Sequence, residues 1–423
     1  MIKIVLLVIF YFTFPFIIIY MCKKWSILKK LGSIVLAYGF GLILGSIGIL
    51  PHGSDAYRLA LQGNPALPDN EIQALLSSGT ISQGDAYVNS IASIQDMLVS
   101  VIVPLSFPLL LFSLNIKRWL RFAKEGFISM ILALISVVVI VSSGYFIFKN
   151  VVPESWKVAG MLVGVYTGGT PNLVSLKVAL GVDPNLFLMT STYDMIVGAI
   201  TIIFFITVGP KLFRAILPPF RHHADTEVTD EMIEEAAGFE DFTGMFRKGR
   251  ILPLLKALGL ALLIFIVSFG ISLLLPNVSQ MVVVILSITT LGILASLVNW
   301  INKIEKTFQL GMYFILVFSF AVASMADLSV VFSIGFLGLF AYISYAYFGT
   351  LILHILLSKI FKVNADDFLI TTTAFVFSPP FVPVVAGALK NKDVIITGIT
   401  VGIIGYVIGN YLGVGLGYFL KGF

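Results

Sequence analysis

The chain contains a succession of apolar runs, each about 20 residues long, separated by polar or charged segments. A helix of that length rises about 30 Å, which matches the hydrocarbon core of a bilayer. Charged residues make up only 12% of the 423 residues, whereas a soluble domain carries roughly 25%. The runs lack the alternating pattern of an outer-membrane β-barrel. The sequence therefore predicts an all-α, multi-pass membrane protein, which we expect in the plasma (inner) membrane.

Twelve segments qualify as spans by this criterion, and the clusters of Lys and Arg near their ends indicate which loops are cytoplasmic. Among the cytoplasmic points are the lysines at 303, 306, 359, 362 and 421. The twelve segments are Ile4–Met21, Leu31–Leu50, Ile91–Leu114, Phe127–Phe148, Val158–Leu180, Leu186–Val208, Ile251–Leu275, Met281–Trp300, Phe308–Met325, Val330–Leu357, Phe368–Leu389 and Val394–Leu420.

The two halves of the chain do not join cleanly under this charge rule. In the first half, the charge rule places Val208 on the outside. In the second half, it places Ile251 on the inside. The connector between them is too polar to cross the membrane. Either one span is therefore miscounted or a basic cluster faces the wrong side, and we suspect the region Ile251–Trp300. The expected number of spans is 11, or 13 if a long span is bent double.

Two of the predicted spans carry the same kind of interruption. One contains Thr167-Gly168-Gly169-Thr170-Pro171-Asn172, and the other contains Ser378-Pro379-Pro380. A shift of 209 positions superposes Pro171 on Pro380 and Leu180 on Leu389. This pattern predicts a first transmembrane repeat at residues 1–209, a charged connector at 210–250 and a second repeat at 251–423.

The interruptions have a physical meaning. Glycine removes side-chain constraint, and proline lacks the N–H that a helix needs. Because unpaired backbone groups are costly in hydrocarbon, such a break survives only beside protein or water. Paired broken helices are typical of transporter binding sites, although a packing kink is the alternative. We predict broken helices at Gly168, Gly169, Pro171, Pro379 and Pro380, and a solute site formed by Thr170, Asn172, Ser378 and Asn410.

Asp194 is a carboxylate at membrane depth. It lies roughly 13 Å into its span at 1.5 Å per residue, where an ionised group must face a cavity or a partner. Hydroxyl groups beside a carboxylate suit Na⁺ or a proton carrier, while a hydrogen-bonded structural aspartate is the alternative. We predict ion coupling through Asp194, Thr192, Thr167 and Thr373.

Several kinds of chemistry are missing from the sequence. The single cysteine, Cys22, excludes a disulfide framework, and the four histidines have no metal-ligand spacing. There is no Gly-x-x-x-x-Gly-Lys-Ser/Thr phosphate loop and no Gly-x-Ser-x-Gly elbow. We therefore expect no enzyme, no metal and no cofactor other than a coupling ion, Na⁺ or H⁺. The expected partners are membrane lipid and a small-molecule solute, not nucleic acid; a homodimer stays open.

Three segments resemble an uncharacterised membrane family known as "domain of unknown function 819": Pro104–Phe112, Tyr166–Asn172 and Gly402–Gly413. That family looks related to bile acid–sodium symporters and cation/proton antiporters. The resemblance implies inverted repeats, a core domain with two crossing broken helices, and a panel domain against which the core moves. This chain departs from the family at Thr371–Pro379, where the family pattern is rich in Asn and Gly.

From the motifs and the resemblance together we expect a secondary active transporter of a small polar solute. It would work by alternating access and be coupled to Na⁺ or H⁺. A cation/proton antiporter without an organic substrate and a channel are the alternatives. Saturable flux with counterflow would separate a carrier from a channel.

Overall fold

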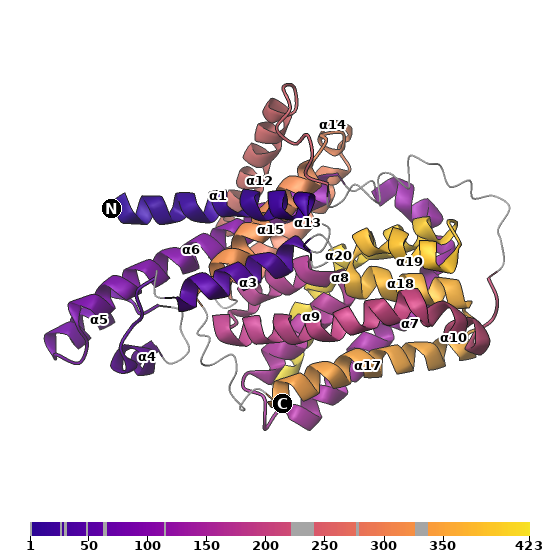
Figure 1. The fold of residues 1–423 in the computed structure, drawn as a ribbon, viewed down its shortest axis with the longest axis horizontal. Helices are drawn as coiled ribbons and strands as arrows, with labels where there is room; N and C mark the ends of the chain where they lie inside the picture. The colour runs from indigo at the N-terminus through magenta and orange to yellow at the C-terminus, as the bar shows by residue number, and fades with distance from the viewer. Residues whose placement is uncertain are drawn as a thin grey trace. The chain divides into compact units, whose positions relative to one another are not determined.

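The computed structural model describes residues 2–25, 28, 32–47, 50–61, 66–113, 116–220, 241–275, 279–325 and 337–423; at 2–4 and 116–125 it describes the backbone alone. Within these ranges every regular element is a helix, as Figure 1 shows, and there is no strand. The all-α prediction is confirmed. Residues 221–240 of the predicted connector and the start of the predicted span Val330–Leu357 lie outside the described residues.

The chain divides into two compact units. Unit 1 comprises Met1–Pro104, Val182–Met189 and Tyr313–Phe336, and unit 2 comprises Leu105–Gly181, Thr190–Met312 and Leu337–Phe423. Each unit draws on both predicted repeats, and the repeat relationship itself stays a prediction. The helices are α1 Ile2–Lys24, α3 Ser33–Ser46, α4 Asp55–Leu61, α5 Asp69–Ser77, α6 Gln83–Phe112, α7 Ile116–Phe148, α8 Ser155–Leu180, α9 Pro184–Thr207, α10 Gly209–Ile216, α12 Ile251–Leu273, α13 Gln280–Ser296, α14 Asn299–Asn302, α15 Thr307–Ser324, α17 Leu337–Ile360, α18 Ala365–Phe377, η3 Pro379–Phe381, α19 Val382–Leu389 and α20 Val394–Lys421.

Eight helices of the described residues are long and apolar enough to cross a membrane. They account for eight of the twelve predicted spans. Of the other four, two correspond to the shorter apolar helices α3 and α13, and two contain the predicted interruptions. The chain is thus a multi-pass α-helical membrane protein.

Unit 1 contains a buried polar contact between distant parts of the chain. The Gln95 side-chain nitrogen donates to the Tyr11 hydroxyl at 2.6 Å and to Ser324 Oγ at 3.1 Å. All three side chains are buried. Hydrogen bonds of this kind help hold helices together in hydrocarbon.

Unit 2 contains the first interruption, in α8. The chain reverses at Gly169, whose φ of 67° and ψ of −159° are not helical and suit glycine. A β-carbon on Gly160 would lie 2.7 Å from Leu180 Cδ1, and one on Gly164 would overlap Leu176. In a continuous helix Gly160 and Leu180 would be about 30 Å apart. Hence α8 is a pair of arms that fold back on each other, which we call hairpin 1.

The second interruption is also a reversal. Between α18 and α19 the chain turns at Ser378, with φ 73° and ψ 164°. Figure 1 shows α18 and α19 side by side, and we call the segment from α18 to α19 hairpin 2. One side chain, Arg214, joins its two ends. Arg214 on α10 donates two hydrogen bonds of 2.8 Å to the buried Asp366 carboxylate and a third to the Leu389 carbonyl.

A row of glycines on α20 packs against both hairpins. Small residues allow helices to approach closely in membranes. β-Carbons on Gly398 and Gly402 would lie 2.7 Å from Val382 and 2.6 Å from Pro379, which belong to hairpin 2. Further along α20, glycines contact hairpin 1 instead. The row consists of Gly398, Gly402, Gly405, Gly409, Gly413 and Gly417.

The order of these contacts shows the direction in which each hairpin lies along α20. A β-carbon on Gly405 would overlap the Thr167 carbonyl at the tip of hairpin 1, and one on Gly413 would lie 2.7 Å from the Gly160 carbonyl further down an arm. From Gly398 towards Gly417, the contacts with hairpin 2 move from its open end to its turn, and the contacts with hairpin 1 move from its turn to its open end. The turns, which we call the tips, therefore point at each other. Their tips meet near Gly405, close to the middle of α20.

This arrangement corrects one expectation. We expected Val158–Leu180 and Phe368–Leu389 to be broken helices that cross the membrane. Each is instead a hairpin whose two ends lie at the same end of α20. The physical reason is that the backbone at Gly169 and Ser378 reverses direction rather than bending, which lets the two arms pack on each other.

We predict that Gly405→Ala destabilises the protein by roughly 1–3 kcal/mol, because the added methyl group would overlap backbone that cannot rotate away. Gly415→Ala on the same helix is the matched control. A β-carbon there would meet nothing within 4 Å, so this variant should gain about 0.5–1 kcal/mol from helix propensity. Thermal unfolding of the detergent-purified protein measures both. Equal behaviour of the two variants would refute the close packing at Gly405.

A second prediction concerns the ends of hairpin 2. Arg214→Met should destabilise the protein by on the order of 2 kcal/mol, because the buried Asp366 carboxylate loses its charged partner and keeps the hydrogen bond from Asn391. The loss is smaller than for a fully buried pair, since the Arg214 side chain is 45% exposed. Adding Asp366→Asn should restore part of the loss by removing the charge. Lys211→Met, on the exposed side of the same helix, is the control and should change little.

Candidate functional site

The two reversals are in direct contact. A β-carbon on Gly169 would overlap Ser378 Oγ, and the backbone conformation of Gly169 also favours glycine. Asn172, on the second arm of hairpin 1, donates from Nδ2 to the Gly405 carbonyl at 3.0 Å. The tips of both hairpins and the middle of α20 thus converge on one point within unit 2.

Backbone ends of four half-helices gather at this point. The first arm of each hairpin ends there, leaving carbonyl groups, and the second arm begins there, leaving N–H groups. Ends of the first kind carry partial negative charge and ends of the second kind partial positive charge. Such a site can receive a cation and an anionic or polar solute side by side.

Asn172 has a hydrogen-bond acceptor that the protein does not use. It is 0% exposed, and its amide oxygen has no hydrogen-bond partner in the described structure. A buried unpaired acceptor costs roughly 1–3 kcal/mol. The sequence predicts a solute-binding role for Asn172, and the geometry leaves this oxygen free at the tip of hairpin 1.

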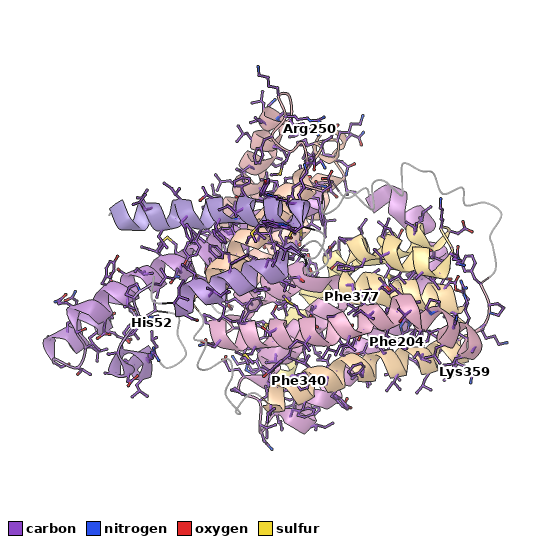
Figure 2. All side chains as sticks on the ribbon, viewed as in Figure 1. His52, Phe204, Arg250, Phe340, Lys359 and Phe377 are labelled. Atoms are coloured by element: carbon purple, nitrogen blue, oxygen red, sulfur yellow. The ribbon has the colours of Figure 1, made fainter. Side chains whose placement is uncertain are left out.

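Asp194 on α9 lies beside the tip of hairpin 1, and the next turn of α9 contacts hairpin 2. Its carboxyl group is next to the hydroxyl of Tyr166, which lies three residues before Gly169. One turn further along α9, a β-carbon on Gly198 would lie 3.3 Å from the ring of Phe377, the residue that precedes Ser378 and is labelled in Figure 2. Asp194 Oδ1 is shielded from solvent and has no hydrogen-bond partner among the described residues.

Two tyrosines near Asp194 were not predicted from the sequence. Tyr166 and Tyr347 pack edge to face, with ring centroids 5.4 Å apart, and both interact electrostatically with Asp194. A carboxylate and two phenol groups therefore lie close together behind the hairpin tips.

The predicted Asn410 has a different setting. It accepts from Ser175 Oγ at 2.8 Å and donates to Thr289 Oγ1 at 3.2 Å. It therefore links hairpin 1, α20 and α13, on the hairpin 1 side of Gly405. Both functions of its amide are engaged within the protein, so its geometry is that of a structural residue.

The predicted threonines differ from one another. Thr167 and Thr373 donate to carbonyls of their own helices, Thr167 to Val163 at 2.8 Å and Thr373 to Leu369 at 2.7 Å. Their oxygens keep lone pairs for a cation. Thr170, at the reversal itself, is half-buried, as is Thr192 on α9. The predicted Gly168, Gly169 and Pro171 lie in or next to the reversal of hairpin 1, and Pro379 and Pro380 follow the reversal of hairpin 2.

His354 on α17 is fully engaged. Its ring nitrogens lie 3.2 Å from Thr372 Oγ1 and 3.1 Å from the Ser129 carbonyl, and the side chain is 1% exposed. Among the described residues, no group of three His, Cys, Asp or Glu side chains could hold a metal ion.

Comparison with known proteins places this architecture in a family. Residues 83–423 match the family described as "Protein of unknown function (DUF819)". The chain is also 23% identical over 344 residues to "Uncharacterized membrane protein YjcL" of Bacillus subtilis (strain 168), a match that covers 78% of this chain and 84% of the relative. The family match includes both hairpins, α9 and α20. The chain belongs to the DUF819 family of membrane proteins.

Proposed function

We propose that this protein is a secondary active transporter that binds a small polar solute where the two hairpin tips meet. The contact between Gly169 and Ser378 is the observation that supports the proposal most strongly. Two re-entrant segments that meet inside a membrane place irregular backbone at membrane depth, where it is tolerated only if it is buried in protein or lines a cavity. Asn172 Oδ1, buried and unpaired, supplies a ready acceptor for the solute or a ligand for a cation.

The hairpins also suggest which loops of the chain lie on each side of the membrane. If hairpin 1 does not cross, α9 ends on the inside and the polar connector stays there, as the charge rule requires. Helices α12, α13, α15 and α17 then bring the basic pairs 303/306 and 359/362 to the inside. Hairpin 2 enters from the inside and hairpin 1 from the outside. In this topology Lys421, which we expected inside, lies on the outer side.

Alternating access follows from this orientation. Hairpin 1 separates the solute from the outside and hairpin 2 separates it from the inside. Displacing one tip at a time would open the site to one side only, which is the requirement for coupled transport. In the described state the tips touch, so the site is closed between them.

The coupling ion is proposed to bind near Asp194. Its carboxylate, with the carbonyl groups at the tips, offers oxygen ligands for Na⁺, or the carboxylate alone can carry a proton. Asp194 neighbours Tyr166 on hairpin 1, and one turn further along α9 Gly198 contacts Phe377 on hairpin 2. A change in the charge of Asp194 would therefore affect hairpin 1 directly and hairpin 2 through α9. The likeness to bile acid–sodium symporters and cation/proton antiporters implied crossing broken helices, so the proposal rests on the hairpins instead.

The function is tested with purified protein reconstituted in liposomes. A thermal-shift panel of small carboxylates, amino acids and sugars, in Na⁺ or choline buffer, first identifies a stabilising solute. We expect its uptake to saturate, to show counterflow and to depend on a Na⁺ or H⁺ gradient. Flux that rises linearly with concentration and shows no counterflow would indicate a channel. Ion exchange without any solute requirement would indicate an antiporter.

We predict that Asp194→Asn uncouples transport. Uptake driven by an ion gradient should fall at least tenfold, while solute counterflow is retained, because the variant keeps the shape of the side chain and loses its charge. Asp194→Glu should keep part of the coupling. Asp69→Asn, on the exposed helix α5, is the control. Full ion-driven uptake by Asp194→Asn would remove Asp194 from the mechanism.

Ser378 provides a separate test of stored strain. Its φ and ψ lie in a region occupied almost only by glycine, at a cost of roughly 1–3 kcal/mol. We predict that Ser378→Gly raises stability by about 1 kcal/mol and weakens solute binding, because the hydroxyl is lost. Ser378→Ala removes the same hydroxyl without relieving the strain. Unfolding temperature and solute affinity separate the two effects; unchanged affinity in both variants would exclude Ser378 from the site.

A further inference from the structure

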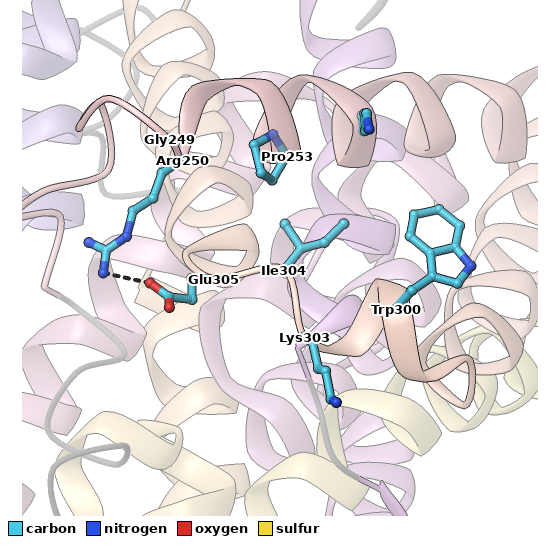
Figure 3. A pocket seen from close by; sticks show the side chains of 8 residues that line it. Gly249, Arg250, Pro253, Trp300, Lys303, Ile304 and Glu305 are labelled. Atoms are coloured by element: carbon cyan, nitrogen blue, oxygen red, sulfur yellow. Dashed lines mark ion pairs between the residues drawn. The ribbon is translucent and has the colours of Figure 1, made fainter.

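A second polar site lies in unit 2 at the charged end of α12 and α13. It is a pocket of about 420 Å³, within the range of roughly 300–1,000 Å³ that small-molecule sites occupy. Figure 3 shows its side chains seen from close by. The lining residues are Gly249, Arg250, Pro253, Lys256, Trp300, Lys303, Ile304 and Glu305.

The charge of this pocket is unbalanced. Its wall carries three basic side chains and one acidic side chain, Glu305. Glu305 pairs with Arg250 at 2.5 Å, the contact drawn as a dashed line in Figure 3. Lys256 and Lys303 are both exposed and leave the pocket with two positive charges beyond that pair. An anion of one or two charges would match it.

The surroundings place the pocket at a membrane boundary. Trp300 is 58% exposed at its rim, and tryptophan concentrates where hydrocarbon meets headgroups. Beside the pocket, Leu252 and Leu255 on α12 are 63% and 57% exposed. Further along, α12 presents a series of exposed apolar side chains: Leu262, Leu263, Ile266, Val267, Phe269, Ile271 and Leu273. Acyl chains would cover such a face, directly below the basic pocket.

We propose that this pocket binds the headgroup of an anionic phospholipid. The phosphate would lie between Lys256 and Lys303, with Trp300 at the glycerol level and the acyl chains along α12. Basic pockets at the ends of membrane helices are a chemically suitable receptor for such headgroups. The ion pair between Arg250 and Glu305 holds one wall in place, so the lysines are the groups available to the lipid. The site is independent of the hairpin tips.

Native mass spectrometry of the detergent-purified, full-length protein tests this. The probes are phosphatidylglycerol, phosphatidylcholine and glycerol 3-phosphate. We expect phosphatidylglycerol to bind at least fivefold more strongly than phosphatidylcholine, because only the former carries net negative charge. Glycerol 3-phosphate, which lacks acyl chains, should not bind or compete at millimolar concentration.

The variant Lys256→Gln/Lys303→Gln should lose the preference for phosphatidylglycerol. Its matched control is Lys359→Gln/Lys392→Gln, which removes two exposed lysines that do not line the pocket and should keep the preference. Since all four lysines are exposed, folding should be unaffected, and the unfolding temperature without lipid verifies this. Equal binding of the two lipids, an unaltered preference in the pocket variant, or tight binding of glycerol 3-phosphate would each overturn the proposal.

Discussion

The contact between two hairpin tips on the glycine row of α20 is the constraint on which unit 2 depends. Neither tip is regular helix, so each exposes backbone groups that hydrocarbon cannot solvate. Each tip meets the other and the middle of α20, where a side chain larger than hydrogen at Gly405 would overlap the backbone of hairpin 1. The absence of side chains along this face of α20 is therefore what allows both hairpins to reach the centre.

The same contact explains why polar groups gather there. Asn172 uses its amide nitrogen to hold the Gly405 carbonyl and keeps its amide oxygen unpaired. Ser378 holds a backbone conformation that a serine adopts only when its surroundings impose it. Backbone strain and an unsatisfied acceptor at one buried point are features of binding sites, and an occupant could supply the donor or cation that the Asn172 oxygen lacks. Asp194 on α9, together with Tyr166 on α8 and Tyr347 on α17, extends this polar region.

Much of this could be predicted from the sequence. Apolar length defined the helices, and the Gly-Gly-Thr-Pro and Ser-Pro-Pro segments gave the positions of both interruptions. The reversal could not be separated from a kink, because either conformation suits those residues. Two signals pointed to it. Glycines at 160, 164 and 168 face Leu180, Leu176 and Asn172, respectively, in a register that is symmetric about residue 170.

The second signal was the mismatch between the halves under the charge rule. We assigned it to Ile251–Trp300, whereas a hairpin 1 that does not cross accounts for it. Other features needed the structure. Arg214 and Asp366 are 152 residues apart, and nothing local marks them as a pair. Tyr166 and Tyr347 lie in apolar runs, where a tyrosine that lines a site looks the same as one that packs in the interior.

The most direct test of the account is the sidedness of the residues that flank each hairpin. Single cysteines would replace Val151, Asn185, Lys359 and Lys392 in a Cys22→Ser background and be labelled in intact cells with a membrane-impermeant thiol reagent. We predict that positions 151 and 185 react from the outside, and that positions 359 and 392 react only after permeabilisation. If 151 and 185, or 359 and 392, reacted from opposite sides, the segments would cross the membrane and the opposed hairpins would be refuted.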